Sequence, residues 1–111
     1  MSGVRYTPAE RRRRAVLLAK GARKAFAGAS TAAIDRQLDR IEQAAADRWR
    51  RDAEAALRLL ERCKDELAAA RARERAASRA DKARARQERK AAEAALRRAE
   101  RAAAKYLPDR L

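Results

Sequence analysis

The chain has 111 residues and a formal net charge of +14, and 32 of its hydrophobic residues are alanine. The few bulky apolar side chains that remain are too few for a compact globule, but they suffice for a narrow seam between helices. Alanine, arginine, glutamate, leucine and lysine dominate, as in long helices and coiled coils. With no histidine, one cysteine and no glycine-rich phosphate loop, we expect no enzyme, metal, cofactor or small-molecule substrate.

The cysteine content and the lack of long apolar runs also indicate the cellular compartment. A single cysteine cannot form an internal disulfide, so nothing indicates an oxidising environment. No apolar run approaches the ~20 residues that span a bilayer, and the first residues lack the apolar segment of a secretory signal. We therefore expect a cytoplasmic protein without a membrane span.

The first predicted helix covers residues 8–27. Thr7 is a suitable N-cap, Pro8 suits the first helical position, and Glu10 completes a capping box. Gly28 is a natural stop, because glycine accepts the left-handed conformation that ends many helices. Ser30 or Thr31 can then cap a second helix.

Residues 28–38 resemble the turn and recognition helix of a helix-turn-helix motif. They carry the turn glycine, a capping serine two residues later, and the inward-facing pair Ile34 and Leu38. Lys24 stands where that motif usually has a small residue, and the second helix continues far beyond Leu38. We therefore interpret the segment as an ordinary helix–helix corner, with base-reading recognition as the alternative.

The second predicted helix is very long, because no glycine or proline interrupts residues 32–107, and Pro108 ends it. A helix over residues 31–106 is the favoured interpretation. The alternative is a break near residue 78, where Ser78 and Asp81 form a second capping-box pattern without a turn residue.

These elements predict an all-α, elongated helical hairpin with a coiled-coil-like seam, in which the first helix covers residue 34 to about residue 53. The apolar stripe of the second helix continues further, so we expect a second copy of the chain, forming a homodimer, or a different protein to cover it. We interpret Trp49 as an anchor of the seam, with base stacking as the alternative. We interpret Cys63 as a small hydrophobic side chain in the core, with a cross-link between two chains as the alternative. The assembly residues are Ile34, Leu38, Ile41, Trp49, Leu60, Cys63 and Leu67.

Charge divides this single predicted domain into three segments. Residues 1–30 carry eight basic and one acidic side chain, residues 31–67 carry eight and nine, and residues 68–111 carry fourteen and six. The segment with the packing stripe is thus close to neutral, while the N-terminal helix and the Ala/Arg-rich C-terminal segment are basic. This division predicts an assembly core with two cationic ends.

Two groups of cations are candidate phosphate contacts. One lies in the first turns of the first helix, where the helix dipole disfavours positive charge. The other falls within an arc of about 100° if residues 71–90 form one helix, with like charges spaced four residues apart. The nucleic-acid-binding candidates are Arg11, Arg12, Arg13, Arg14, Arg71, Arg75, Arg79, Lys82, Arg86, Arg89 and Lys90.

The sequence therefore favours a small basic protein that binds DNA or RNA mainly through phosphates, as an accessory of a replicon or phage or as a nucleoid- or ribosome-associated factor. The alternative is a helical scaffold that binds a protein partner through its apolar stripe, with the cations serving solubility. Membrane-surface binding is disfavoured, because alanine rather than Leu, Phe or Trp backs the basic face.

Overall fold

The computed structural model describes residues 3–106, and all regular structure within them is helical. The helices are α1 (Pro8–Phe26), α2 (Ala32–Ala76) and α3 (Lys82–Ala104). The chain divides into two compact units, Met1–Arg51 and Asp52–Leu111, with the boundary inside α2. The predicted all-α class is confirmed. The predicted helix end at Pro108 lies outside the described residues.

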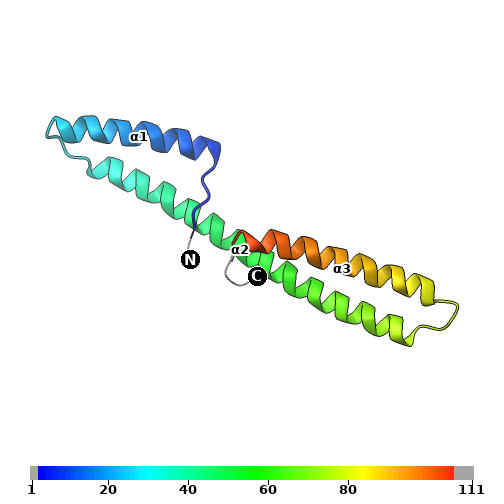
Figure 1. Ribbon diagram of the computed structural model, residues 1–111. Helices are drawn as coiled ribbons and strands as arrows, with labels where there is room; N and C mark the ends of the chain where they lie inside the picture. The colour runs from blue at the N-terminus through cyan, green and yellow to red at the C-terminus, as the bar shows by residue number, and fades with distance from the viewer. Residues whose placement is uncertain (1–2, 107–111) are drawn as a thin grey trace. The chain divides into compact units, whose positions relative to one another are not determined.

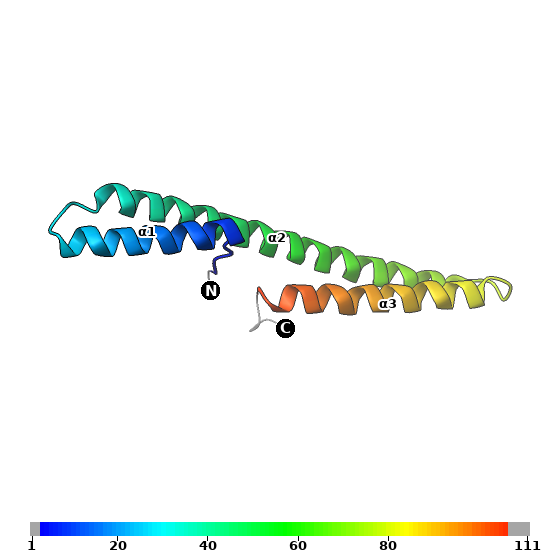
Figure 2. The same ribbon diagram turned by 90° about the horizontal axis from the view of Figure 1, so that it is seen from above.

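Each unit is a helical hairpin (Figures 1 and 2). We call α1 with α2 up to Arg51 the N-terminal hairpin, and the rest of α2 with α3 the C-terminal hairpin. In both views α1 lies beside the first part of α2, and α3 lies beside its last part.

The predicted capping box at the start of α1 is present. The backbone N–H of Glu10 donates to Thr7 Oγ1 at 3.1 Å, and the backbone N–H of Thr7 donates to Glu10 Oε1 at 2.8 Å. Two backbone donors at the helix N-terminus are thereby satisfied reciprocally. The first helix therefore begins where its sequence specifies.

Gly28 ends α1 as predicted. Its φ of 77° lies in the left-handed region, and it is the one positive-φ residue among those described. The N–H groups of Gly28 and Ala29 donate to the carbonyls of Ala25 and Lys24 at 3.1 and 2.8 Å. This is the Schellman pattern, which satisfies the last carbonyls of a helix. The segment is therefore a hairpin corner, as the favoured interpretation of residues 28–38 held.

The core of the N-terminal hairpin is built from bulky aliphatic side chains. Leu17 of α1 is buried against Ile34 and Ile41 of α2, and Leu38 and Tyr6 pack against this cluster. The cluster lies on the predicted face of α2, so the covering role expected of the first helix is observed.

The segment before α1 lies against α2. The backbone N–H of Arg5 donates to the carbonyl of Ala45 at 3.2 Å, and Arg48 Nη1 donates to the carbonyl of Arg5 at 2.5 Å. Gly3 sits against the indole of Trp49, where a β-carbon would come within 2.5 Å of the ring. Trp49 is therefore partly covered within its own hairpin.

The long second helix breaks at the position given as the alternative. α2 ends at Ala76 and α3 begins at Lys82, so a single helix over residues 31–106 is not observed. The backbone N–H of Asp81 donates to Ser78 Oγ at 3.3 Å, and that hydroxyl donates to Asp81 Oδ2 at 3.0 Å. These side-chain bonds compete with helical ones and form a turn without glycine or proline.

The break changes what covers the apolar stripe. Leu60 and Cys63 of α2 are buried against Ala99 and Ala103 of α3, with Leu96 packed alongside. Leu67 is also buried, 5% exposed. The premise that this part of the stripe is uncovered within one chain is therefore wrong: the C-terminal helix of the same chain folds back onto it.

Candidate nucleic-acid interface

The four consecutive arginines at the start of α1 point in different directions, because successive helical residues are about 100° apart. The side chains of Arg11 and Arg12 are exposed, and neither guanidinium makes a hydrogen bond or ion pair with another described residue. Arg13 is also exposed, but its Nη2 donates to Gln37 Oε1 at 3.0 Å. Only part of the predicted cluster is thus available to an outside anion.

Arg14 is turned toward its own hairpin. Its guanidinium carbon lies 5.3 Å from the centroid of the Tyr6 ring, and its Nη2 lies 4.0 Å from Glu42 Oε1. A guanidinium over an aromatic ring is attracted by the ring's quadrupole. Arg14 therefore serves the packing of the N-terminal hairpin.

The predicted arc of seven cations over residues 71–90 does not exist as one helical face. Arg71 and Arg75 lie near the end of α2, Arg79 lies in the turn, and Arg86 and Lys90 lie on α3. The arc assumed an unbroken helix, so the Ser78–Asp81 turn separates residues that a helical wheel places together. All five of these side chains are nevertheless exposed.

Two members of that group have internal roles. Lys82 Nζ donates to the carbonyl of Glu74 at 2.6 Å, next to the end of α2, where backbone carbonyls lack helical partners. Arg89 donates through Nε to the Glu74 carboxylate and through Nη1 to Glu93 Oε1 at 2.8 Å. Both cations therefore tie α3 to α2.

These contacts shift the pKa values of Arg89 and Glu93 in opposite directions. Hydrogen bonding to Glu93 and then to Glu74 raises the pKa of Arg89. The hydrogen bond from Arg89 lowers the pKa of Glu93 below its ordinary value of 4.5, and the positive charges of Arg89, Arg71 and Arg97 lower it further. A comparable contact in the N-terminal hairpin joins Arg48 to Glu10 at 2.8 Å and lowers the pKa of Glu10.

The predicted assembly residues lie inside the two hairpins. Ile34, Ile41, Leu60, Cys63 and Leu67 are buried, while Leu38 and Trp49 are partly exposed. Cys63 is a free thiol in the C-terminal core, which is the predicted role of a small hydrophobic side chain. The stripe that motivated a homodimer or a partner protein is thus largely occupied by the chain's own helices.

Sequence reasoning missed four exposed cations on α3: Arg84, Arg97, Arg98 and Arg101. Of these, Arg84 is paired with Asp81. The predicted arc ended at Lys90, because the next charged residue on the same arc is the acid Glu93. In the structure Glu93 is bound by Arg89 and lies at the edge of the exposed face. The four-residue steps from Arg86 to Lys90 and from Arg97 to Arg101 were visible in the sequence.

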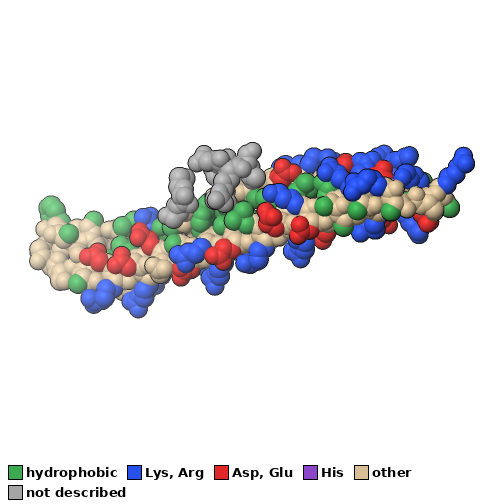
Figure 3. Space-filling view, turned by 90° about the horizontal axis from the view of Figure 1, so that it is seen from below, with side chains coloured by type: hydrophobic (Ala, Val, Ile, Leu, Met, Phe, Trp, Pro, Cys, Tyr) green, Lys and Arg blue, Asp and Glu red, His purple; other side chains and the backbone are tan. Residues whose placement is uncertain are grey.

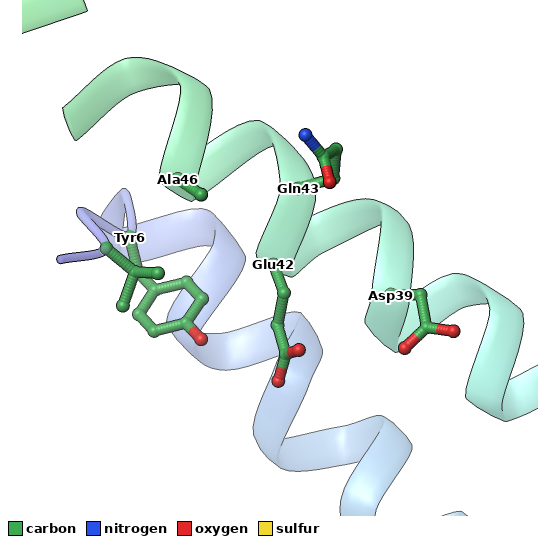
Figure 4. Close-up of a pocket in the computed structure, with 6 residues that line it drawn as sticks. Tyr6, Asp39, Glu42, Gln43 and Ala46 are labelled. Atoms are coloured by element: carbon green, nitrogen blue, oxygen red, sulfur yellow. The ribbon is translucent and has the colours of Figure 1, made fainter. Parts of the chain in front are cut away.

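An open hollow in the N-terminal hairpin is lined by Tyr6, by Asp39, Glu42 and Gln43 of α2, and by Val4 and Ala46, and has a volume of about 530 Å³. Figure 4 shows Tyr6 on the segment before α1 and the two carboxylates on α2. Carboxylates repel phosphate oxygens, so this hollow is not a phosphate site.

Within residues 3–106, no cluster of three or more His, Cys, Asp or Glu side chains is arranged to hold a metal ion. No helix in the described part of the chain is long and apolar enough to cross a bilayer. Comparison with protein-family models, with curated proteins and with solved structures found no match.

Proposed function

We propose that this protein binds nucleic acid, mainly through contacts between its arginine and lysine side chains and phosphates. One observation carries the proposal: the C-terminal segment uses its acids internally and leaves most of its cations exposed. Residues 68–106 contain thirteen Lys or Arg and five Asp or Glu. Four of those five acids form ion pairs, and only three arginines supply all of these pairs.

The three arginines and four acids pair as follows. Arg73 lies 3.6 Å from Glu88, Arg84 lies 3.3 Å from Asp81, and Arg89 binds both Glu74 and Glu93. The other cations of residues 68–106 form no ion pair with a described residue, although the charges of Arg71 and Arg97 also act on Glu93, which Arg89 binds. Glu100 is the one acid in this range without an ion pair. Exposed cations in excess attract polyanions, and they release the counterions that surround nucleic acid when they bind it.

The structure narrows the residues proposed for phosphate contact. Lys82, Arg89, Arg13 and Arg14 hold their own hairpins together and are removed from the contact set. The proposed contacts are Arg11, Arg12, Arg71, Arg75, Arg79, Arg86 and Lys90.

The proposal can be tested by fluorescence anisotropy. The probes are labelled duplex DNA, single-stranded DNA and RNA, each measured across a salt series. We expect dissociation constants of about 10⁻⁶ M or tighter at about 0.1 M salt, with affinity falling steeply as salt rises. Polyglutamate of matched charge is the control, because it presents carboxylates without phosphates. Absence of binding to all three nucleic acids at this salt concentration would show the proposal to be wrong.

A second candidate, a helical scaffold that binds a protein partner or a second copy, has one observation in its favour. Phe26, at the end of α1, is 97% exposed, and Val16 and Leu18 of the same helix are 63% and 47% exposed. Phe26 replaces the Leu60–Leu67 stripe as the proposed contact, because it is the most exposed of these side chains. Light scattering tests self-association: a mass that stays at 12.4 kDa over a micromolar concentration series excludes the dimer, whereas a Phe26-dependent rise supports it.

A further inference from the structure

A row of cations runs along the solvent face of α3. Arg86, Lys90, Arg97 and Arg101 are all exposed, and at 100° per residue they fall within an arc of about 60°. We call these four residues the α3 row. At 1.5 Å per residue the row is about 22 Å long. In Figure 3, Lys and Arg side chains gather along the upper right of the view, over α3.

The opposite face of α3 fixes the direction of the row. Ala85, Ala99 and Ala103 are buried, with the last two in the core formed with α2. A helix held by that face cannot rotate, so the row stays toward solvent. Glu93, at the edge of the row, is engaged by Arg89.

Two pairs of like charges lie within the row. Arg86 and Lys90 are four residues apart, as are Arg97 and Arg101, and like charges at this spacing destabilise a helix. Anions bound along the row relieve this repulsion. Arginine, which supplies three of the four positions, matches phosphate oxygens with a planar fork of donors.

Other features of α3 select among polyanions. The helix contains no aromatic residue, so it offers no platform on which the bases of a single strand stack. The side chains around the cations are small or polar: Ala83, Gln87 and Ala94, with Glu93 and Glu100 along one edge. They lack the bulk that inserts into a lipid interface. A straight, fixed row suits an anion whose charges are also held at regular intervals, as phosphates are along a duplex.

We propose that the α3 row binds the phosphate backbone of double-helical nucleic acid, and that the protein prefers a duplex to a single strand of the same length. This inference rests on the proposed function and adds the class of nucleic acid and the residues that contact it.

A pair of matched variants tests the row. The row variant carries R86Q, K90Q, R97Q and R101Q. The control variant carries R36Q, R40Q, R58Q and R62Q, four exposed arginines of α2. Both lose four charges, and glutamine has nearly the helix propensity of arginine and lysine. Circular dichroism verifies that both retain the helix content of the parent.

With a labelled duplex, we expect the row variant to bind on the order of 10²-fold more weakly than the parent at about 0.1 M salt. The slope of log affinity against log salt should shrink by about 3.6, the value for four lost phosphate contacts. The control variant should keep the parent's slope. The parent should bind the duplex at least about tenfold more tightly than the single strand.

The outcomes separate the two proposals. If the parent binds no nucleic acid, the proposed function itself is wrong. If the parent binds but the row and control variants weaken equally, the function stands and the row is not the contact surface. If the parent binds single strand as tightly as duplex, the preference for double helix is wrong.

Discussion

The two hairpins have the same fold, but different kinds of residue form their turns and their cores. The N-terminal hairpin closes through Gly28, with its φ of 77°, and fills its core with Leu17, Ile34 and Ile41. The C-terminal hairpin closes through Ser78 and Asp81, and α3 contributes Ala99 and Ala103 to a core whose bulk comes from α2. The difference teaches that an alanine-rich helix can pack with a single large apolar side chain, Leu96, when its partner supplies the rest of the bulk.

The two hairpins also differ in what their ion pairs connect. In the N-terminal hairpin Arg48 bridges Glu10 and the carbonyl of Arg5, so it fastens the segment before α1. In the C-terminal hairpin Arg89 bridges acids on both helices, Glu74 on α2 and Glu93 on α3. The second arrangement joins the two helices of the hairpin, and it leaves Arg86, Lys90 and Arg101 exposed on the outer face of α3.

The largest expected effect tests whether the bulk in the C-terminal core really comes from α2. Leu60→Ala removes a side chain that is 3% exposed, and we expect it to lower the free energy of unfolding by about 2–5 kcal/mol. Urea denaturation followed by circular dichroism measures the change. Leu59→Ala is the neighbouring control: Leu59 is 39% exposed, so its loss should cost less than about 1 kcal/mol. Equal effects would contradict the assigned core.

A smaller effect tests the turn of the N-terminal hairpin. Gly28→Ala places a β-carbon at φ 77°, which costs about 1–2 kcal/mol for an L-residue. Gly21→Ala is the matched control, since its β-carbon would lie 3.4 Å from Ile34 Cγ2, at ordinary contact. Inside a helix this replacement should be neutral or stabilise by up to about 1 kcal/mol. Chemical denaturation of the two variants should give changes in the free energy of unfolding that are opposite in sign or clearly different in size. Equal destabilisation would show that the turn does not require glycine at residue 28.

The smallest expected effect is the response to acid, which compares the two ion-pair arrangements. Glu10 and Glu93 both have a pKa below the ordinary 4.5. Their stabilising contribution is therefore complete above about pH 4.5 and is lost as pH falls through the lower folded-state pKa. Thermal unfolding should show a lower Tm at acidic pH, and Glu10→Gln or Glu93→Gln should make that fall shallower. A pH profile unchanged in both variants would contradict these assignments.

The signals that the sequence carried most clearly were those made by adjacent residues. Thr7, Pro8 and Glu10 specify the start of α1, and Gly28 specifies its end, because caps and left-handed turns are determined within a few positions. The spacing of Ile34, Leu38 and Ile41 likewise predicted the inner face of the first part of α2. These features needed no knowledge of distant contacts.

The remaining features depend on contacts that only folding creates. Arg89 and Glu74 are fifteen residues apart, and Lys82 reaches the Glu74 carbonyl eight residues away, so neither pair is visible without the turn. The turn itself has no glycine or proline, and Ser78 with Asp81 is a weak local signal. Alanine also hides the packing face of α3, since it is common on both sides of a helix and gives little amphipathic contrast.

The close approach of Gly3 to Trp49 has a practical consequence. Trp49 is the sole tryptophan of the chain, and it belongs to the N-terminal hairpin. Its emission therefore reports on one hairpin, while far-ultraviolet dichroism reports on all three helices. An unfolding curve recorded with both probes shows directly whether the two hairpins, which share α2, melt as one cooperative unit or in succession.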